Sequence, residues 1–272
     1  MVEGVVVKVK SSVETKDALV VACFPSVGMV SSIVAHYLID HLNLSFVGGV
    51  NHPKLPPLCL VHEGAPLPPI RVYAGAPICN VDGCDNLILI MSELQIPDPL
   101  VNELVDSLFQ WSKDSNIGAG ILLDAFARKG MRGGPEITSE PMIEYDDTEE
   151  IDVLGVGATQ HTRDMLSGME IPLVEQGVLR NMTGVLLGEG RRRGLDILAI
   201  LVEADPRFPD ARAAAELITH LKTLLPAAEL DAAPLIEEAE RLESQLKAMM
   251  ENHLSSGEGG SSDDGSSSML YG

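Results

Sequence analysis

Basic residues are scarce in this sequence, and their scarcity excludes several classes of partner. The 272 residues contain 19 Lys and Arg against 40 Asp and Glu, which gives a formal charge of −21 at pH 7. A surface with this charge repels phosphate backbones and anionic lipid headgroups, so we expect no nucleic acid and no membrane as partner. The acidity is typical both of adaptation to high intracellular salt and of an ordinary soluble acidic protein, and charge alone does not choose between them.

Long apolar runs and paired cysteines are also missing. No stretch approaches the ~20 consecutive apolar residues that a membrane helix requires, and the N-terminus lacks the basic and apolar regions of a signal peptide. These absences lead us to expect a cytoplasmic protein. The four cysteines form no C-x-x-C pair and the seven histidines show no H-E-x-x-H spacing, so we expect no metal site.

Motifs for nucleotide or acyl chemistry are incomplete. The sequence has no G-x-x-x-x-G-K-[ST] loop, and residues 155–160 supply only two of three dinucleotide glycines. Arg191–Arg193 could hold a phosphate, but a basic last turn also complements a helix dipole, and we favour that structural interpretation. Ser26 lacks a G-x-S-x-G context, which favours a helix N-cap. We therefore expect no cofactor, no catalytic residue and no enzyme; the alternative is an α/β hydrolase or nucleoside-phosphorylase-like enzyme with a site at the strand ends near Ser26 and Thr159.

What the sequence does contain is an alternation of buried strands and helices. The strands are predicted at residues 18–24, 86–91, 118–123, 153–156, 171–174 and 195–202, and the helices at 29–42, from Pro97 to Trp111, at 181–193 and at 211–225. Such alternation requires crossover connections and predicts an α/β fold of three layers, with a mainly parallel sheet flanked by helices. The runs 58–61 and 70–73 are candidates for an added antiparallel hairpin.

The chain divides into a predicted α/β core domain over residues 1–229 and a C-terminal extension. Within the core, the Gly-rich and charged segment 128–150 interrupts the alternation and is interpreted as a surface insertion, with a functional loop as the alternative. Residues 230–254 are predicted to form an amphipathic helix. Its apolar residues recur every three or four positions over about two heptads, which favours packing on its own domain over a coiled coil.

The last eighteen residues change composition abruptly. Residues 255–268 contain only Ser, Gly, Asp and Glu, which predicts a disordered tether with a root-mean-square span of roughly 20 Å and a reach of about 45 Å. The tether carries the apolar cluster 269–272, and disordered tails usually stay polar to their end. Tyr271 offers a large apolar face, Leu270 suits a second apolar pocket, and the carboxylate of Gly272 suits a lysine or a backbone nest. We predict a docking motif at Leu270, Tyr271 and Gly272; the alternative is an untethered tail or a cloning scar.

The chain also resembles a known family. Residues 24–28, 67–73, 92–97 and 183–188, together with Glu203–Pro206, resemble the proteasome assembly chaperone family of archaea and some bacteria, and the resemblance extends from about residue 17 to 246. The C-terminus resembles the hydrophobic-tyrosine-any motif with which proteasome activators and assembly chaperones insert between α-subunits of the core particle. In that motif Leu270 is the hydrophobic position, Tyr271 the tyrosine and Gly272 the free residue.

This resemblance implies a fold and a function. The fold would be a phosphorylase/hydrolase-like α/β domain. The protein would be a homo-oligomer that docks on the α-subunits of the proteasome core particle through its C-terminus and acts as an assembly chaperone, an ATP-independent activator, or both. Several tails on one oligomer would raise avidity without new contacts.

Overall fold

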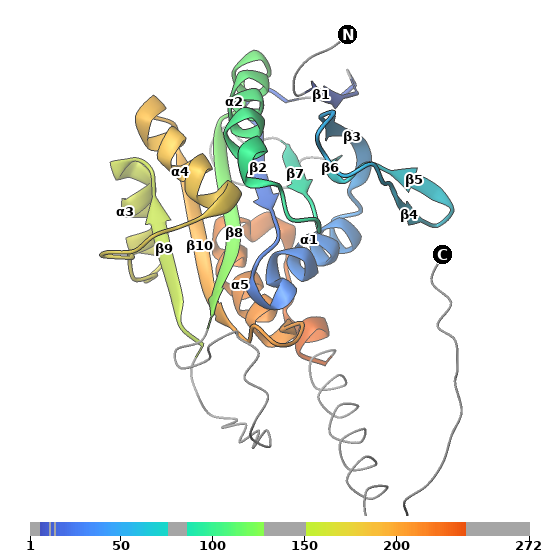
Figure 1. The fold of residues 1–272 in the computed structure, drawn as a ribbon. Coiled ribbons are helices and arrows are strands. Elements are labelled where there is room, and N and C mark those ends of the chain that lie inside the picture. The colour runs from blue at the N-terminus through green and yellow to red at the C-terminus, as the bar shows by residue number, and fades with distance from the viewer. Residues whose placement is uncertain (1–5, 11, 14, 76–85, 128–150, 238–272) are drawn as a thin grey trace, which may run out of the picture.

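An eight-stranded sheet runs through the centre of the molecule, and helices cover both of its faces (Figure 1). The computed structural model describes residues 6–10, 12–13, 15–75, 86–127 and 151–237. The strand order in the sheet is β1-β3-β6-β7-β2-β8-β10-β9, and β4 and β5 form a separate two-stranded sheet. The described elements are β1 (Val6–Val9), β2 (Leu19–Cys23), the 3-10 helix η1 (Val27–Met29), α1 (Val30–His41), β3 (Ser45–Asn51), β4 (Leu60–His62), β5 (Ala65–Leu67), β6 (Ile70–Ala74), β7 (Leu87–Met91), α2 (Asp98–Asp114), β8 (Ala119–Ala127), β9 (Val153–Gly157), α3 (Gln160–Gly168), α4 (Asn181–Arg193), β10 (Ile197–Ala204), α5 (Ala211–Leu224) and the 3-10 helix η2 (Pro226–Ala228).

The four central strands are parallel, and the outer strands are not. β2 pairs in parallel with β7 and β8, and β8 pairs in parallel with β10. On one side β6, β3 and β1 add antiparallel pairs, and on the other side β9 runs antiparallel to β10. The predicted α/β class and parallel centre are confirmed, while the flanking strands make the whole sheet mixed rather than mainly parallel.

Strand β2 shows why a continuous apolar run occupies the middle of this sheet. Leu19, Val21 and Cys23 belong to one buried cluster, whereas Ala18 and Ala22 belong to the cluster on the opposite face. Alternate side chains of a strand point to opposite faces, so a strand with helices on both sides needs apolar residues at every position.

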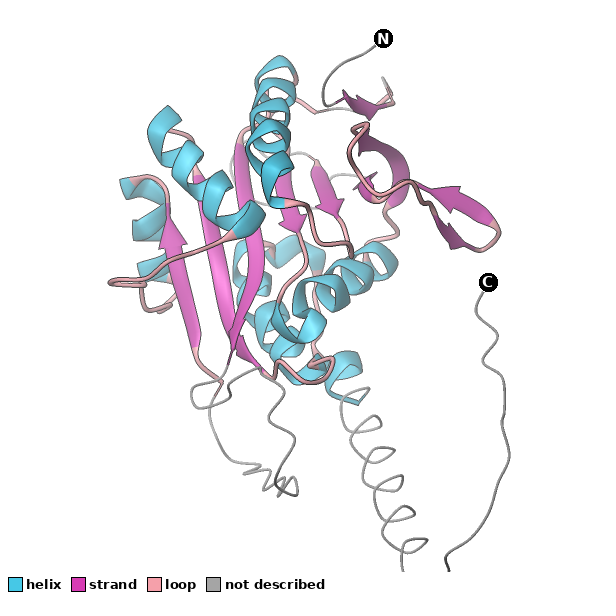
Figure 2. Cartoon of the chain, in the orientation of Figure 1, coloured by secondary structure: helices cyan, strands magenta, loops and turns pink. Residues whose placement is uncertain are grey.

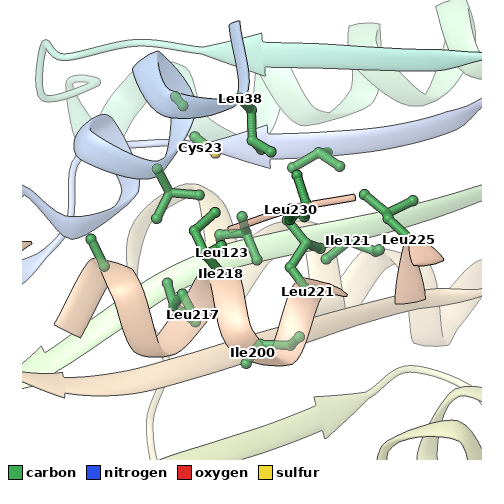
Figure 3. Close-up of a cluster of buried hydrophobic side chains, with 14 of the residues drawn as sticks. Cys23, Leu38, Ile121, Leu123, Ile200, Leu217, Ile218, Leu221, Leu225 and Leu230 are labelled. Carbon is green, nitrogen blue, oxygen red and sulfur yellow. The ribbon is translucent and has the colours of Figure 1, made fainter. Parts of the chain in front are cut away.

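The helices form the two outer layers (Figure 2). Helices α1, α3 and α5 contribute to one cluster, and α2 and α4 contribute to the other. Helix α5 is typical: Asp210 caps it by accepting a hydrogen bond from the backbone N–H of Ala213, and its apolar residues recur at helical spacing. Figure 3 shows Leu217, Ile218 and Leu221 of α5 beside Ile121, Leu123 and Ile200 of the strands.

Two predictions about individual elements need correction. The hairpin is formed by β4 and β5, whereas residues 70–74 enter the main sheet as β6 between β3 and β7. The turn of the hairpin places Glu63 and Gly64 at positive φ, as tight two-residue hairpin turns require. Residues 171–174 make only an isolated bridge from Leu173 to Gly155. The structure also contains β1, β3 and α3, which the sequence did not predict.

The C-terminal extension is described only at its beginning. Residues 233–237 are helical, and Leu230 and Leu235 are buried in the same cluster as α1 and α5, which supports packing of this start on its own domain. The rest of the predicted helix, the tether, the docking motif, the segment 128–150, and Cys79 and Cys84 lie outside the described residues. In the part of the chain that is described, no helix has the length and apolarity needed to cross a bilayer.

Candidate functional site

Most of the family-like segments meet at one end of the sheet. The parallel strands β2, β7, β8 and β10 terminate at this end, and we call it the carboxyl edge. Residues 24–28 follow β2, residues 92–97 follow β7, and residues 205–206 follow β10. Arg71 joins them because β6 runs antiparallel to β7 and places Arg71 beside Met91, the last residue of that strand. Ligands of open α/β sheets commonly bind at this edge, which makes it the first candidate site.

Ser26 and Gly28 shape the turn from β2 into α1. Ser26 is not the N-cap of α1, a position that Met29 occupies, and it precedes η1 without a side-chain capping bond. Its hydroxyl oxygen nevertheless accepts a hydrogen bond of 2.9 Å from the backbone N–H of Ser31 in the first turn of α1. Gly28 has φ of +60°, and a Cβ there would lie 3.0 Å from the Asp205 carbonyl oxygen and from the Asp210 Cβ. The conformation and the crowding together require glycine.

Asp210 ties the β10 end to the same turn. One carboxylate oxygen accepts a hydrogen bond from the Ala213 N–H at 2.9 Å, and the other accepts from the Asp205 N–H at 3.0 Å. The Asp210 N–H donates to the Gly28 carbonyl at 2.8 Å. These hydrogen bonds therefore hold the loop between β10 and α5 against the turn between β2 and α1.

Arg71, Glu93 and His36 form a charged cluster beside the turn. Arg71 is almost fully buried and donates from Nη2 to Oε1 of Glu93, and His36 Nε2 lies 3.0 Å from the same oxygen. Burial opposes ionisation of Glu93, but hydrogen bonds from His36 and Arg71 outweigh it and lower the Glu93 pKa to about 2. Arg71 Nε and Nη1 and Glu93 Oε2 are buried without a partner in the described part of the chain, so the pair is held through one contact rather than two.

An open groove of about 650 Å³ lies on the outer face of this cluster, and we call it the carboxyl-edge groove. Its apolar lining includes Met29, which is 52% exposed, together with Ile33 and Leu235. The polar rim includes His36 and Glu93. A lining that combines exposed apolar side chains with polar ones is typical of a protein interaction surface. Because Leu235 lines the groove, the C-terminal extension leaves the described part of the chain beside it.

The geometry does not favour the enzyme alternative. Ser26 lies at the carboxyl edge, whereas Thr159 caps α3 and donates a 2.6 Å hydrogen bond to Asp196, which precedes β10 at the opposite edge. Eight strand residues separate the two edges, or about 25 Å, so the two hydroxyls cannot serve one site. Burial, with a smaller effect of the Asp124 carboxylate, raises the pKa of the Cys23 thiol, which makes this cysteine a poor nucleophile.

The other motifs with possible ligand chemistry have structural partners. Arg191 donates to the Ala158 carbonyl, Arg192 pairs with Glu189, and Arg193 pairs with Glu189 and Asp106. The structural interpretation of this basic turn is therefore supported. Gly157 allows close approach of α3, because a Cβ there would lie 2.6 Å from the Arg163 nitrogen. Within the described residues, no cluster of three or more His, Cys, Asp and Glu could hold a metal ion.

The sequence drew attention to Arg71 and Glu93 only as parts of family-like segments and assigned them no role. One signal was available: Arg71 is a lone charge inside the apolar run 70–74, which is unusual for a buried strand. The predicted docking residues Leu270, Tyr271 and Gly272 lie outside the described residues, and the structure does not place them.

Known proteins are similar to this chain over most of its length. A sequence model described as the PAC2 family matches residues 20–250. The uncharacterized protein MJ0106 of Methanocaldococcus jannaschii is 28% identical over 254 residues, which cover 93% of this chain and 94% of that protein.

Two solved structures from Pyrococcus furiosus have the same fold. PbaA, described as an archaeal homolog of proteasome-assembly chaperone, superposes with a TM-score of 0.75 at 28% identity, covering 93% of this chain and 94% of its own. PbaB, described as an archaeal proteasome activator, gives a TM-score of 0.73 at 18% identity, covering 91% of this chain and 99% of its own. The identity to PbaB is low enough that this second likeness shows the fold alone.

Proposed function

Because the chain belongs to the PAC2 family, we propose that it is a proteasome-binding factor that docks on the α-subunits of the core particle. The observation that carries the proposal is the likeness to PbaA over 93% of the chain. The family-like segments support it further, because most of them meet at the carboxyl edge of the sheet, and Glu93 of one segment lines the groove beside it.

The docking element of the proposal is the C-terminal tripeptide Leu270, Tyr271 and Gly272. The extension leaves the described part of the chain beside the carboxyl-edge groove, and 35 further residues (238–272) separate this point from the C-terminus. The Ser/Gly/acidic composition of 255–268 suits a flexible connection. Tyr271 would fill an apolar pocket and the Gly272 carboxylate would meet a lysine or backbone N–H groups between two α-subunits.

The direct experiment is binding to purified core particles on a native gel. We expect wild type to shift the core particle, and Tyr271→Ala and a variant with one residue appended after Gly272 to lose the shift. Met269→Ala is the matched control, because it removes an apolar side chain next to the motif and should bind like wild type. Unchanged binding by both motif variants would reject docking through the tail.

Assembly of new core particles and opening of finished ones both begin with the same docking event. Hydrolysis of a fluorogenic peptide by mature core particles separates them. An activator raises the hydrolysis rate when added to mature particles, whereas an assembly chaperone raises only the yield of particles formed from free subunits.

We also propose that the protein acts as a homo-oligomer. Several tails on one oligomer would bind several pockets of the α-ring, and the effective concentration of the second tail would raise the overall affinity. Light scattering coupled to size exclusion measures the number of subunits, and a monomer at micromolar concentration would reject this part of the proposal.

A further inference from the structure

An apolar cavity of about 80 Å³ lies between the sheet and the helices α2 and α4, and no part of the proposed function uses it. We call it the α2–α4 cavity. It extends along the sheet to the amino ends of β2, β8 and β10. The carboxyl-edge groove is lined by α1, which covers the other face of the sheet, so the two sites are separate.

The α2–α4 cavity exists because a side chain is missing at Gly120. In the sheet Gly120 lies between Val20 of β2 and Ile197 of β10. Both neighbours carry branched side chains on the face that α2 and α4 cover. A Cβ added at Gly120 would meet no atom closer than Ile197 Cγ1, at 3.6 Å. This row of the sheet therefore has room for at least one further methyl group.

The exposure of Val20 shows that the two helices leave a gap over this part of the sheet. Val20 lies in the central strand β2, between β7 and β8, yet it is only partly buried, whereas Val21 on the opposite face is fully buried. Leu195, which lines the cavity just before β10, is 40% exposed. A central strand with helices on both faces is normally buried on both. The gap therefore gives a ligand a way into the cavity.

Contacts between α2 and α4 fix the helical wall of the cavity. The Arg193 guanidinium of α4 lies 4.6 Å from the centre of the Phe109 ring of α2 and also pairs with Asp106 of the same helix. Phe109 is itself buried and lines the cavity. These contacts hold the two helices at the spacing that keeps the cavity open, which makes it a preformed site.

The lining of the cavity selects for apolar ligands of small size. Among the described residues that line it, only Ser112 and Asp196 have side chains with oxygen atoms. An apolar group gains free energy by leaving water for such a lining, whereas an ionised group loses its hydration there. A cavity of roughly 150 Å³ accommodates benzene. A cavity of about 80 Å³ fits a smaller group, such as a branched alkyl chain of about four carbons.

We propose that the α2–α4 cavity binds an uncharged ligand through a compact branched alkyl group. The alkyl group contacts Val20, Gly120 and Ile197 of the sheet and Trp111 of α2. The polar end of the ligand leaves the cavity past Leu195 and stays in water. The volume at Gly120 limits the size of the alkyl group, and the apolar lining excludes charged groups.

Trp111 allows a direct test, because it is the only tryptophan of the chain and it lines the cavity. The experiment titrates 3-methyl-1-butanol into the purified full-length protein and records tryptophan fluorescence. We expect a saturable change in emission, with a dissociation constant of about 1 mM. Ethylene glycol, which lacks the alkyl group, and 3-methylbutanoate, which carries a charge, should cause no saturable change.

Two substitutions at Gly120 fill the cavity in steps. Neither alanine nor valine at this position brings Cβ into a clash, and both suit a strand better than glycine, so both variants should melt at or above the wild-type temperature. Gly120→Ala should weaken binding of the alcohol about tenfold, and Gly120→Val should abolish it. Gly188→Ala is the matched control, because Gly188 lies on the exposed side of α4 with nothing within 4 Å of an added Cβ. It should bind like wild type.

Several results would overturn the proposal. One is the absence of a saturable emission change with 3-methyl-1-butanol, and another is an equal change with ethylene glycol. Wild-type affinity in Gly120→Val would reject the assigned site, and Gly120→Ala decides the same question if the larger side chain lowers the melting temperature. Equal binding of 3-methylbutanoate would reject the selection for uncharged ligands. Since no core particle is present, these outcomes are independent of proteasome docking.

Discussion

Arg71 and Glu93 form an ion pair between β6 and the segment that follows β7, with side chains 3% and 21% exposed. The charge of Arg71 is thereby removed from water at the carboxyl edge and has Glu93 as its anionic partner. Removing one partner of such a pair leaves an uncompensated buried charge, whereas replacing both can be neutral.

Glu93→Gln should therefore destabilise the protein by about 3 kcal/mol at pH 7. The double variant Arg71→Met/Glu93→Gln should recover most of this loss, because it removes the stranded charge as well. Urea unfolding measures both free energies. A double variant no more stable than Glu93→Gln would mean that Arg71 contributes through packing rather than through charge.

The same ion pair predicts that the stability of the protein falls in acid. The Glu93 pKa is about 2 in the folded protein, against about 4.3 for Glu in an unfolded chain. Ionised Glu93 therefore stabilises the fold fully above about pH 5, and this contribution is lost as the pH falls from 5 towards 2. The stability difference between wild type and Glu93→Gln should shrink over that interval. A difference that stays constant with pH would contradict the lowered pKa.

Asp124 predicts a pH dependence of stability with the opposite sign. Burial raises its pKa, and hydrogen bonds from Thr183 and from the Ala125 N–H only partly oppose this effect. The folded state thus stabilises the protonated form, and stability falls as the pH rises through the folded-state pKa. Asp124→Asn keeps the acceptor oxygen and removes the charge, so it should melt at a higher temperature than wild type at pH 7. The difference should vanish below about pH 3, where Asp is largely protonated in both states.

Gly28→Ala should destabilise the turn into α1. A Cβ at Gly28 meets backbone and side-chain atoms near 3.0 Å at φ +60°, whereas Gly64 has φ of +78° with open space around it. Gly64→Ala is therefore the matched control for backbone strain alone, at about 1 kcal/mol. We expect Gly28→Ala to cost about 2–3 kcal/mol, the excess being crowding. Equal losses in the two variants would show that the turn relaxes around the methyl group.

Cys23 and Cys59 should differ in reactivity. Cys23 is buried with a raised pKa, and Cys59 is exposed on the segment that leads into the β4–β5 hairpin. Iodoacetamide should label Cys59 in the native protein and Cys23 only after unfolding, because the thiolate is the reactive form. Peptide mapping by mass spectrometry separates the two sites. Rapid native labelling of Cys23 would indicate that the core around β2 opens.

The sequence predicted the elements that have strong local patterns. Helix α4 begins at Asn181 and ends at Arg193 as expected, and β2, β7 and β10 follow from apolar runs long enough to be buried on both faces. Strand β3 was missed because Ser45, Gly48 and Gly49 break its apolar pattern. Helix α3 was missed because it has nine residues and only two that are buried.

At the carboxyl edge, local sequence patterns predicted only part of the observed structure. Ser26 was predicted to be a helix N-cap, whereas the intervening 3-10 turn η1 makes Met29 the N-cap of α1, and Ser26 instead accepts a hydrogen bond from the Ser31 N–H. The ion pair of Arg71 with Glu93 was not predicted, because it depends on β6 pairing antiparallel with β7, a contact between segments about twenty residues apart. Thr159 was assigned to the same crevice as Ser26 because the antiparallel direction of β9 has no signature in the sequence.

By itself, the sequence determined the α/β class, the central strands, the main helices, the acidity and the composition of the C-terminal extension, because periodicity, chain length and charge express these properties locally. Only the tertiary structure decided the order and direction of the outer strands, the burial of Arg71 against Glu93, the groove beside Leu235, and the cavity at the amino ends of β2, β8 and β10. Strand order and side-chain burial depend on contacts between distant segments, and the free energy of those contacts is set by the packed whole rather than by any one stretch of residues.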